Sequence, residues 1–461
     1  MTSSGQYRRD TDTLGEVMIP RYAYYGAETQ RAVENFQISG IVLPRTFIKA
    51  HGIIKSSAAL INMELGKLSQ DIGQAIIQAS EEVIQGKWDD HFVVDVYQAG
   101  AGTSQNMNAN EIIANRASEI LTGRIESNKI NPHDHVNQSQ STNDTFPSAL
   151  NMAAAENLVQ RLLPAVNKLQ QALEQKSQEF MPILKSGRTH LHDAVPMRLG
   201  QEFSGYAGTI QNAYHQIENS LDLLYEIGLG GNAIGTVNNT HPQYSEKVIA
   251  EIARRTNLPF RQPKNLFSFM QNRNAAFQTM ASLKDLAIHL IKITSDLRLL
   301  SSGPRTGLSE ITLPSVQPGS TIMPGKVNPA ILEMTHMVCC RVIGNESAMA
   351  AAGMAGQLEI NVMMPFIAYT LLESIELLSN SLETLVSKCI NGIGVNEENC
   401  RNWMESSLSL VTGLSPLLGY DLAAQIGKEA DEQNKPIKEI LLEKGLLNPQ
   451  TEKALEPEGL L

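Results

Sequence analysis

The chain has 461 residues, a net charge of −11, 42% hydrophobic residues and 18% charged residues. This balance is typical of a soluble globular protein, and the acidic excess argues against a nucleic-acid partner, which would need a basic face. No apolar run approaches the roughly 18 residues of a membrane span, and residues 1–20 lack a secretory apolar core, so no membrane association is expected and the cytoplasm is the expected location. The four cysteines lack the spacing of a metal site, so we expect reduced thiols, no metal and no cofactor.

The first part of the chain, residues 1–142, is expected to form a mixed, mostly helical domain. Residues 8–20 look extended and rich in turns, whereas the apolar spacing over 44–66 and 69–86 predicts helices. The glycine-rich sequence Q-A-G-A-G-T-S-Q-N-M-N at 98–108 predicts a loop that brings hydroxyls and amides, Thr103 among them, to a helix over 109–121. It lacks the lysine of a nucleotide P-loop and the glycine spacing of a dinucleotide fold, so a simple capping turn is an equally good interpretation.

A central domain of long helices is expected over 143–394. The helical patterns cover 147–180, 204–228, 242–255, 271–300, 329–349 and 365–390. Helices of roughly 25 to 30 residues that are apolar on more than one face favour a bundle buried on several sides, most simply by other subunits. A long monomeric bundle is the alternative. Shorter helices at 421–429 and 437–445 belong to a small C-terminal domain over 395–461.

Two polar clusters lie within or beside the central helices. The sequence N-Q-S-Q-S-T-N-D at 137–144 is typical of a helix N-cap with local backbone bonding. The sequence G-R-T-H-L-H-D at 187–193 predicts a basic turn between helices that carries a histidine, and a lone histidine is more often structural than catalytic. Its spacing also lacks the helical register of a metal site.

The sequence Q-P-G-S-T-I-M-P-G-K-V-N-P at 317–329 cannot be helix interior, because proline lacks an N–H and glycine costs backbone entropy. Asn328 followed by Pro329 predicts the N-cap and first position of a new helix. Free N–H groups at that helix start, together with Lys326, suit a carboxylate or a phosphate. Ser320 lies in the glycine-flanked part, where backbone N–H groups could stabilise an alkoxide. A plain connector between two bundle helices is the other interpretation.

The segment G-S-T-I-M-P-G-K-V-N closely resembles the signature loop of the fumarase/aspartase superfamily, usually G-S-S-x-M-P-x-K-x-N. The resemblance implies that Ser320, between Gly319 and the second loop glycine Gly325, is the catalytic base. It also implies that Lys326 and Asn328 bind a substrate carboxylate. Thr321 replaces the usual second serine of the family, which keeps a hydroxyl at this position and adds a methyl group.

The other clusters match the same superfamily in order, over a similarity that extends from about residue 14 to 447. Its G-x-G-T, S-x-S-[ST]-N-D and G-R-T-H segments imply a substrate-binding set formed by Thr103, Ser141, Thr142, Asn143 and Thr189, and a catalytic His190 that is paired with Glu333. The implied fold is mainly α, with three domains and a central long-helix bundle that forms the core of a homotetramer. Each active site of that tetramer would take its segments from three subunits and act on a small dicarboxylate.

Within the superfamily, the closest resemblance is to aspartase, which implies reversible deamination of L-aspartate to fumarate and ammonia. Aspartase-like segments include Q-G-K-W at 85–88, G-Q-L-E at 356–359 and K-C-I-N-G-I at 388–393. Fumarases usually carry H-P-N-D as an accessory anion site, and here N-P-H-D at 131–134 lacks the first histidine. Class II fumarase remains the alternative, because G-G at 230–231 and T-H-P at 240–242 are fumarase-like. A lyase recruited as a structural protein with a dead site is a third interpretation, which the intact set of site residues disfavours.

Overall fold

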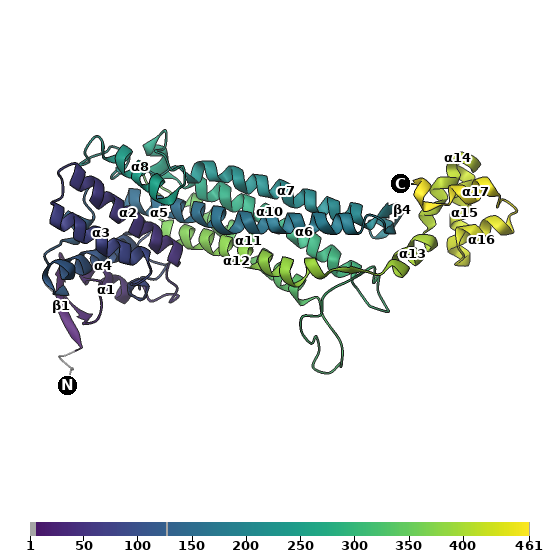
Figure 1. The fold of residues 1–461 in the computed structure, drawn as a ribbon, viewed down its shortest axis with the longest axis horizontal. Helices are drawn as coiled ribbons and strands as arrows, with labels where there is room; N and C mark the ends of the chain where they lie inside the picture. Colours follow the sequence, from purple (N-terminus) through teal and green to yellow (C-terminus); the bar gives the residue numbers. More distant parts are fainter. Residues whose placement is uncertain (1–5, 126–127, 461) are drawn as a thin grey trace. The chain divides into compact units, whose positions relative to one another are not determined.

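The computed structural model describes residues 6–125 and 128–460, and the chain is mainly α, as predicted (Figure 1). The chain divides into two compact units. Unit 1 comprises Met1–Pro164, His215–Asp285 and Cys340–Leu378, and unit 2 comprises Ala165–Tyr214, Leu286–Cys339 and Ser379–Leu461. The boundary falls inside the long helices, which are α6 (Leu163–Glu179), α7 (Leu199–Leu224), α10 (Asn274–Leu300), α11 (Ala330–Met354) and α12 (Met364–Lys388).

Unit 1 starts with an antiparallel hairpin of β1 (Tyr7–Asp12) and β2 (Gly15–Pro20), so the extended character predicted for 8–20 is confirmed. Its other elements are α1 (Ala27–Asn35), α2 (Arg45–Glu64), α3 (Gln70–Ile84), η1 (Asp89–His91), α4 (Thr103–Thr122), η3 (Pro132–Val136), α5 (Thr142–Asn157), η4 (Leu158–Leu162), α8 (Tyr244–Thr256) and α9 (Leu266–Gln271).

Helix α2 is the centre of unit 1, because it packs against α3, α5 and α8. It is buried on all sides between Phe47 and Met63, apart from the partly buried Lys49 and Leu60. Small side chains in its middle, from Ser56 to Ala59, allow neighbouring helices to approach closely. The apolar spacing over 44–66 therefore produced the predicted helix, and its all-round burial explains why no single apolar face stands out in the sequence.

Unit 2 contains the hairpin of β3 (Leu184–Thr189) and β4 (His192–Arg198) and the short antiparallel pair β5 (Ile311–Thr312) and β6 (Gly394–Val395). Its C-terminal part is formed by η5 (Ile390–Gly392), α13 (Glu397–Ser406), η6 (Leu408–Leu414), α14 (Ser415–Leu418), α15 (Tyr420–Gln433), α16 (Ile437–Glu443), α17 (Pro449–Ala454) and η7 (Pro457–Leu460). A separate small core, with Ile426, Ile440 and Leu441 at its centre, holds η6, α14, α15, α16 and α17 together.

Three predictions about local structure named the right kind of element but were wrong in its bounds or detail. The helix expected over 109–121 begins at Thr103, because Gly102 adopts the left-handed φ of +84° and ends the loop there. The turn expected between helices at 187–193 is part of the β3–β4 hairpin. The pattern over 147–180 comprises α5, η4 and α6, so one predicted helix is divided by a π-helical turn.

The division at 142/143 and 394/395 into three domains stays a prediction. Among the described residues, no helix is both long enough and apolar enough to cross a membrane.

Candidate active site

The loop that precedes α11 is closed at a narrow neck. The Gly319 N–H donates to the Lys326 carbonyl (2.8 Å), and Asn328 Nδ2 donates to the Gly319 carbonyl (2.7 Å). A Cβ on Gly319 would lie 2.6 Å from the backbone nitrogen of Asn328, so only glycine fits at this crossing. Gly325 turns the chain back with a left-handed φ of +80°. The backbone geometry of the loop therefore explains why glycine stands at both positions of the motif.

Ser320 lies in this loop with two backbone donors on its hydroxyl oxygen. Its Oγ accepts hydrogen bonds from the N–H groups of Met323 (2.9 Å) and Ile322 (3.3 Å). N–H donors stabilise a deprotonated oxygen more than a neutral hydroxyl. The side chain is only half-buried, so a substrate can reach it. This geometry is what an alkoxide base requires.

The charged residues Lys326 and Glu333 lie on either side of the start of α11. Lys326 is exposed, and within the described part of the chain its ammonium forms no ion pair with a carboxylate. Helix α11 begins at Ala330, one residue later than predicted, and Asn328 uses its amide on the loop neck rather than as a helix cap. Glu333 lies in the first turn, 3.8 Å from Arg298 Nη2. The loop that carries Ser320 therefore also carries a cation that has no ion-pair partner among the described residues.

His190 occupies the tip of the β3–β4 hairpin. His190 and Leu191 both adopt left-handed φ values, +57° and +61°, between the paired residues Thr189 and His192. Two consecutive non-glycine residues in this region strain the backbone, and such strain collects at functional sites. Both Thr189 and His190 are exposed. The sequence indicated a turn here but not this strain.

Buried ion pairs hold the base of that hairpin. Glu310, which is fully buried, contacts Lys185 (3.2 Å) and Arg188 (2.8 Å), and Lys185 also pairs with Glu202 (2.9 Å). On the other strand, the hydroxyl of Ser409 donates to the Ala194 carbonyl (2.7 Å). The base of the hairpin is therefore fixed to the rest of unit 2 by buried ion pairs and by a hydrogen bond.

Unit 1 presents hydroxyls at the start of α4. The two glycines before it are required by close packing, because a Cβ on Gly100 would lie 1.9 Å from the Val362 carbonyl and one on Gly102 would lie 2.1 Å from the Phe146 ring. Thr103 is the first residue of α4 and is exposed. The free N–H groups of a helix start therefore adjoin its hydroxyl.

The polar cluster at 137–144 forms the start of α5. Ser141 is the N-cap, with its Oγ accepting from the Asn143 N–H (3.2 Å) and its own N–H donating to Asp144 (3.1 Å). Asn143 Nδ2 donates to the Ala233 carbonyl (2.9 Å). Thr142 Oγ1 accepts from Asn106 Nδ2 (3.1 Å), which joins the starts of α4 and α5. The capping role that the sequence indicated is confirmed for Ser141.

A buried lysine supports this arrangement, and the sequence reasoning missed it. Lys55 on α2 is fully buried, and its Nζ donates to the amide oxygens of Asn106 (2.9 Å), Asn137 (3.0 Å) and Gln140 (3.0 Å). Asn106 in turn contacts Thr142. A lysine in the middle of the apolar run H-G-I-I-K-S-S-A-A-L-I was the available signal, since a buried lysine needs a polar partner.

Asp144 is the second buried charge of this region. Burial lowers the pKa of Lys55 to about 7 and raises the pKa of Asp144 to about 7, while each charge partly relieves the shift of the other. Asp144 is further held by the N–H of Gly230 (3.1 Å). A buried polar network that includes Lys55 and Asp144 therefore fixes the start of α5.

Replacing Lys55 with methionine should destabilise the protein and misplace Thr142. The buried amide oxygens of Asn106 and Gln140 lose their donor, whereas Asn137 Oδ1 keeps the donors Asn106 and Asn110, and the loss costs about 2–4 kcal/mol of unfolding free energy. We expect a clear loss in thermal unfolding temperature and a lower kcat in the variant. Lys49→Met on the same helix is the control, because Lys49 is partly exposed and pairs with Glu156. Equal stability of the two variants would contradict the role of Lys55.

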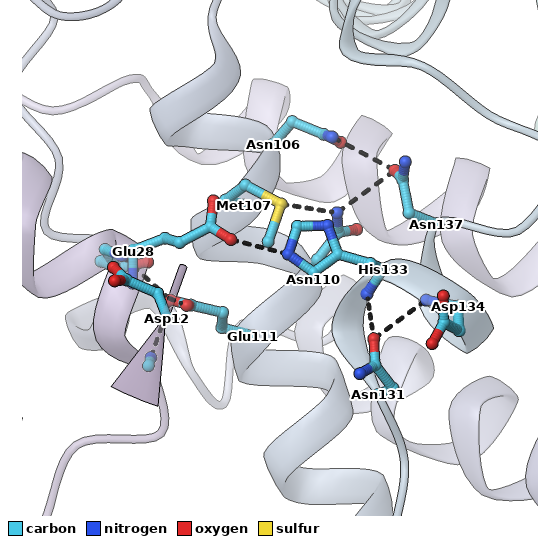
Figure 2. Close-up of polar contacts among 12 residues, drawn as sticks. Asp12, Glu28, Asn106, Met107, Asn110, Glu111, Asn131, His133, Asp134 and Asn137 are labelled. Carbon is cyan, nitrogen blue, oxygen red and sulfur yellow. Dashed lines mark hydrogen bonds and ion pairs between the residues drawn. The ribbon is translucent and has the colours of Figure 1, made fainter. Parts of the chain in front are cut away.

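Residues 131–134 lie beside an acidic pocket of unit 1 (Figure 2). His133 Nε2 is 2.6 Å from Glu28 Oε1, and Asn131 Oδ1 accepts from the N–H groups of His133 (2.8 Å) and Asp134 (3.0 Å). The pocket, of about 350 Å³, is also lined by Asp12 and other acidic residues. The imidazole that the sequence offers here is thus already held by a carboxylate.

Glu111 closes the inner side of this pocket (Figure 2). Its carboxylate accepts from the N–H groups of Gly26 (2.8 Å), Glu28 (3.0 Å) and Thr29 (3.1 Å), at the start of α1. Burial raises the pKa of Glu111 to about 7 despite these donors. Acidic side chains from β1, α1 and α4 therefore line the wall of the pocket.

The predicted site residues form two groups in the structure. Ser320, Lys326 and Asn328 share one closed loop of unit 2, and Thr103, Ser141, Thr142 and Asn143 lie at the joined starts of α4 and α5 in unit 1. Within the described residues no hydrogen bond or ion pair joins His190 to Glu333, so their pairing stays a prediction. The roles of all these residues also stay predictions.

Comparison with known proteins identifies the class. Residues 15–344 match the family model described as Lyase, and residues 410–461 match the model described as Fumarase C C-terminus. A class II fumarase from Schistosoma mansoni is similar in structure, with a TM-score of 0.95 and 37% identity over 98% of both chains. The fold and the signature loop therefore define a lyase with the fumarase fold.

Curated relatives give the family. The chain is 46% identical to "Fumarate hydratase class II" from Neisseria meningitidis, over 95% of this chain and 96% of the relative. It is 44% identical to "Aspartate ammonia-lyase" from a Bacillus species, over 96% of this chain and 95% of the relative. The protein belongs to the fumarase/aspartase superfamily. The predicted superfamily is thereby confirmed, while relatives of both activities stand at similar identity.

Proposed function

We propose that the protein is an aspartate ammonia-lyase, which deaminates L-aspartate reversibly to fumarate and ammonia. The observation that carries this choice is the sequence of residues 131–134 together with the contact that His133 makes. The position of the fumarase accessory anion site holds asparagine first, and its histidine is bound to Glu28 beside an acidic pocket. Such a pocket disfavours a second dicarboxylate. The aspartase-like segments of the sequence agree with this choice.

The proposed base is Ser320. Its oxygen takes the Cβ proton of L-aspartate, and the electron pair moves onto the adjacent carboxylate to give a dianionic aci-carboxylate. That intermediate then forms the double bond as the C–N bond breaks and ammonia leaves. The N–H groups of Ile322 and Met323 favour the deprotonated serine.

The dianion needs donors that strengthen as its charge doubles. Lys326 and Asn328 from the loop supply a cation and an amide, and the remaining donors proposed are Thr103, Ser141, Thr142, Asn143 and Thr189. The departing nitrogen is a cation that needs acceptors, which side-chain oxygens and a neutral His190 backed by Glu333 can provide. Thr321 adds a further hydroxyl next to Ser320 in the loop.

We further propose that the enzyme is a homotetramer whose active sites each take residues from three subunits. The long helices of the central bundle, with apolar residues on several faces, support burial by neighbouring subunits. The exposed, strained His190 without a hydrogen-bond partner in its own described chain agrees with a partner from another subunit. Working in the cytoplasm is part of this proposal, although the names of some relatives place those proteins in mitochondria.

Class II fumarase is the second candidate, favoured by Gly230-Gly231 and by relatives such as the Neisseria enzyme. Both reactions use the same dicarboxylate and the same base, and they differ in the group that leaves. Water leaves from a neutral hydroxyl that needs a proton donor, whereas ammonia leaves from a cation.

Incubation with L-aspartate and, separately, with L-malate distinguishes the candidates. We expect fumarate absorbance to rise and ammonia to be released with L-aspartate, and L-malate to be dehydrated poorly or not at all. Efficient malate dehydration without ammonia release from aspartate would make the protein a fumarase. A folded protein that turns over neither substrate would support the recruited structural role.

A further inference from the structure

A second polar pocket lies in unit 1, between the end of α9 and the start of α10. It has a volume of about 240 Å³, several times that of a water molecule. Its walls come from α5, α7, α9, α10 and the segment before α9, with a set of side chains dominated by amides: Asn151, Asn265, Asn272 and Asn274, joined by Ser268 and Lys264. None of these residues belongs to the candidate active site.

Arg273 in the wall of this pocket is a buried cation without a counter-ion. Only 5% of the residue is exposed, and in the described part of the chain no carboxylate forms an ion pair with it. Its Nη2 donates to the carbonyls of Phe269 and Met270 (3.0 Å to Met270), and its Nε has no hydrogen-bond partner. These hydrogen bonds from Arg273 cap the C-terminal end of α9, but the two carbonyls carry no full negative charge.

The guanidinium of Arg273 is oriented by Phe269, another residue of the pocket wall. The central carbon of the guanidinium, Cζ, lies 5.2 Å from the centre of the Phe269 ring. Burial alone lowers the pKa of Arg273 to about 9, which means that the charged form is held without compensation. A bound anion would supply the missing compensation.

The other polar groups of the pocket also suit an anion. Helix α10 begins at Asn274, so its free N–H groups and partial positive charge adjoin Arg273. Lys264, which precedes α9 in the chain whereas Arg273 follows it, adds an exposed ammonium to the pocket lining. One carboxylate, Glu226, also lines the pocket, and it lies 3.8 Å from Arg261 Nη2, which partly matches its charge.

We propose that this pocket binds a small oxyanion, a phosphate or a carboxylate, through Arg273 and the start of α10. Both chemistries present paired oxygens to a planar guanidinium and accept backbone N–H donors. The pocket has room for one such group with waters, and not for a folded partner. Its occupation would stabilise the α9–α10 turn, since the anion binds the folded chain alone.

The test is equilibrium dialysis of the full-length protein with radiolabelled inorganic phosphate and, in a second arm, with labelled acetate. We expect at least one of the two to bind, and Arg273→Gln to weaken that binding about ten- to a hundredfold, the usual effect of losing hydrogen bonds to a charged group. The arm that responds identifies the anion. Lys326→Gln should retain the binding, because Lys326 lies in the other unit, in the signature loop.

Asn274→Asp is the second variant, because Arg273→Gln removes a helix cap and can impair folding. The new carboxylate at the first position of α10 should raise the thermal unfolding temperature without anion and abolish the Arg273-dependent binding. Matched controls are Arg401→Gln and Asn402→Asp, the same changes at exposed positions of α13, and both should bind as the wild type does. Absence of binding in both arms, or equal binding by wild type and Asn274→Asp, would overturn the proposal.

Discussion

Replacing Ser320 with alanine is expected to lower kcat by roughly three orders of magnitude, the usual contribution of a positioned general base. Alanine has no oxygen to take the Cβ proton, while the N–H groups of Ile322 and Met323 remain available to water. Substrate binding should persist, because Lys326 and Asn328 are unchanged. The measurement is fumarate absorbance under saturating substrate, with fumarate affinity determined separately.

The control for this variant is Ser315→Ala, the same change at an exposed position shortly before the loop. It should leave kcat unchanged. Retention by Ser320→Ala of more than about a tenth of the wild-type activity would remove Ser320 from the role of base. Loss of fumarate binding in the same variant would indicate a structural defect of the loop instead.

Much of the helical framework could be predicted from the sequence, because long runs with helical apolar spacing have few alternatives. The helices expected over 44–66 and 69–86 appear as α2 and α3 with ends shifted by a few residues at most. The errors lie where a tertiary contact decides the backbone. Gly102 packs on Phe146, and this contact fixes where α4 begins, while the hairpin at 187–193 depends on ion pairs with the distant Glu310.

The candidate site was predictable where it rests on a contiguous motif. Gly319 and Gly325 have the close crossing and the left-handed backbone that the signature loop demands. The support by Lys55 was not predictable in detail, because its partners Asn137 and Gln140 lie far along the chain from α2. Local pattern indicates which residue is unusual, and only the fold shows what it contacts.

Mixing two inactive variants should restore activity if the sites are shared among subunits. Ser320→Ala and His190→Ala chains, unfolded and refolded together in equal amounts, assemble at random into tetramers. If each site takes its serine loop and its histidine from different subunits, about a quarter of the sites receive both intact groups. We therefore expect about a quarter of the wild-type activity from the mixture, and almost none from either variant refolded alone.

The matched negative control is a mixture of Ser320→Ala with Asn328→Ala chains. Both residues lie in one closed loop, where Asn328 Nδ2 bonds the carbonyl of Gly319 beside Ser320. Every loop in this mixture carries one defect, so no redistribution of subunits can assemble an intact site. Recovery in the first mixture and not in the second would place Ser320 and His190 of each site on different chains. Failure of the first mixture, or an active monomer in solution, would contradict the shared site, because one chain would then have to bring the hairpin tip and the loop together by itself.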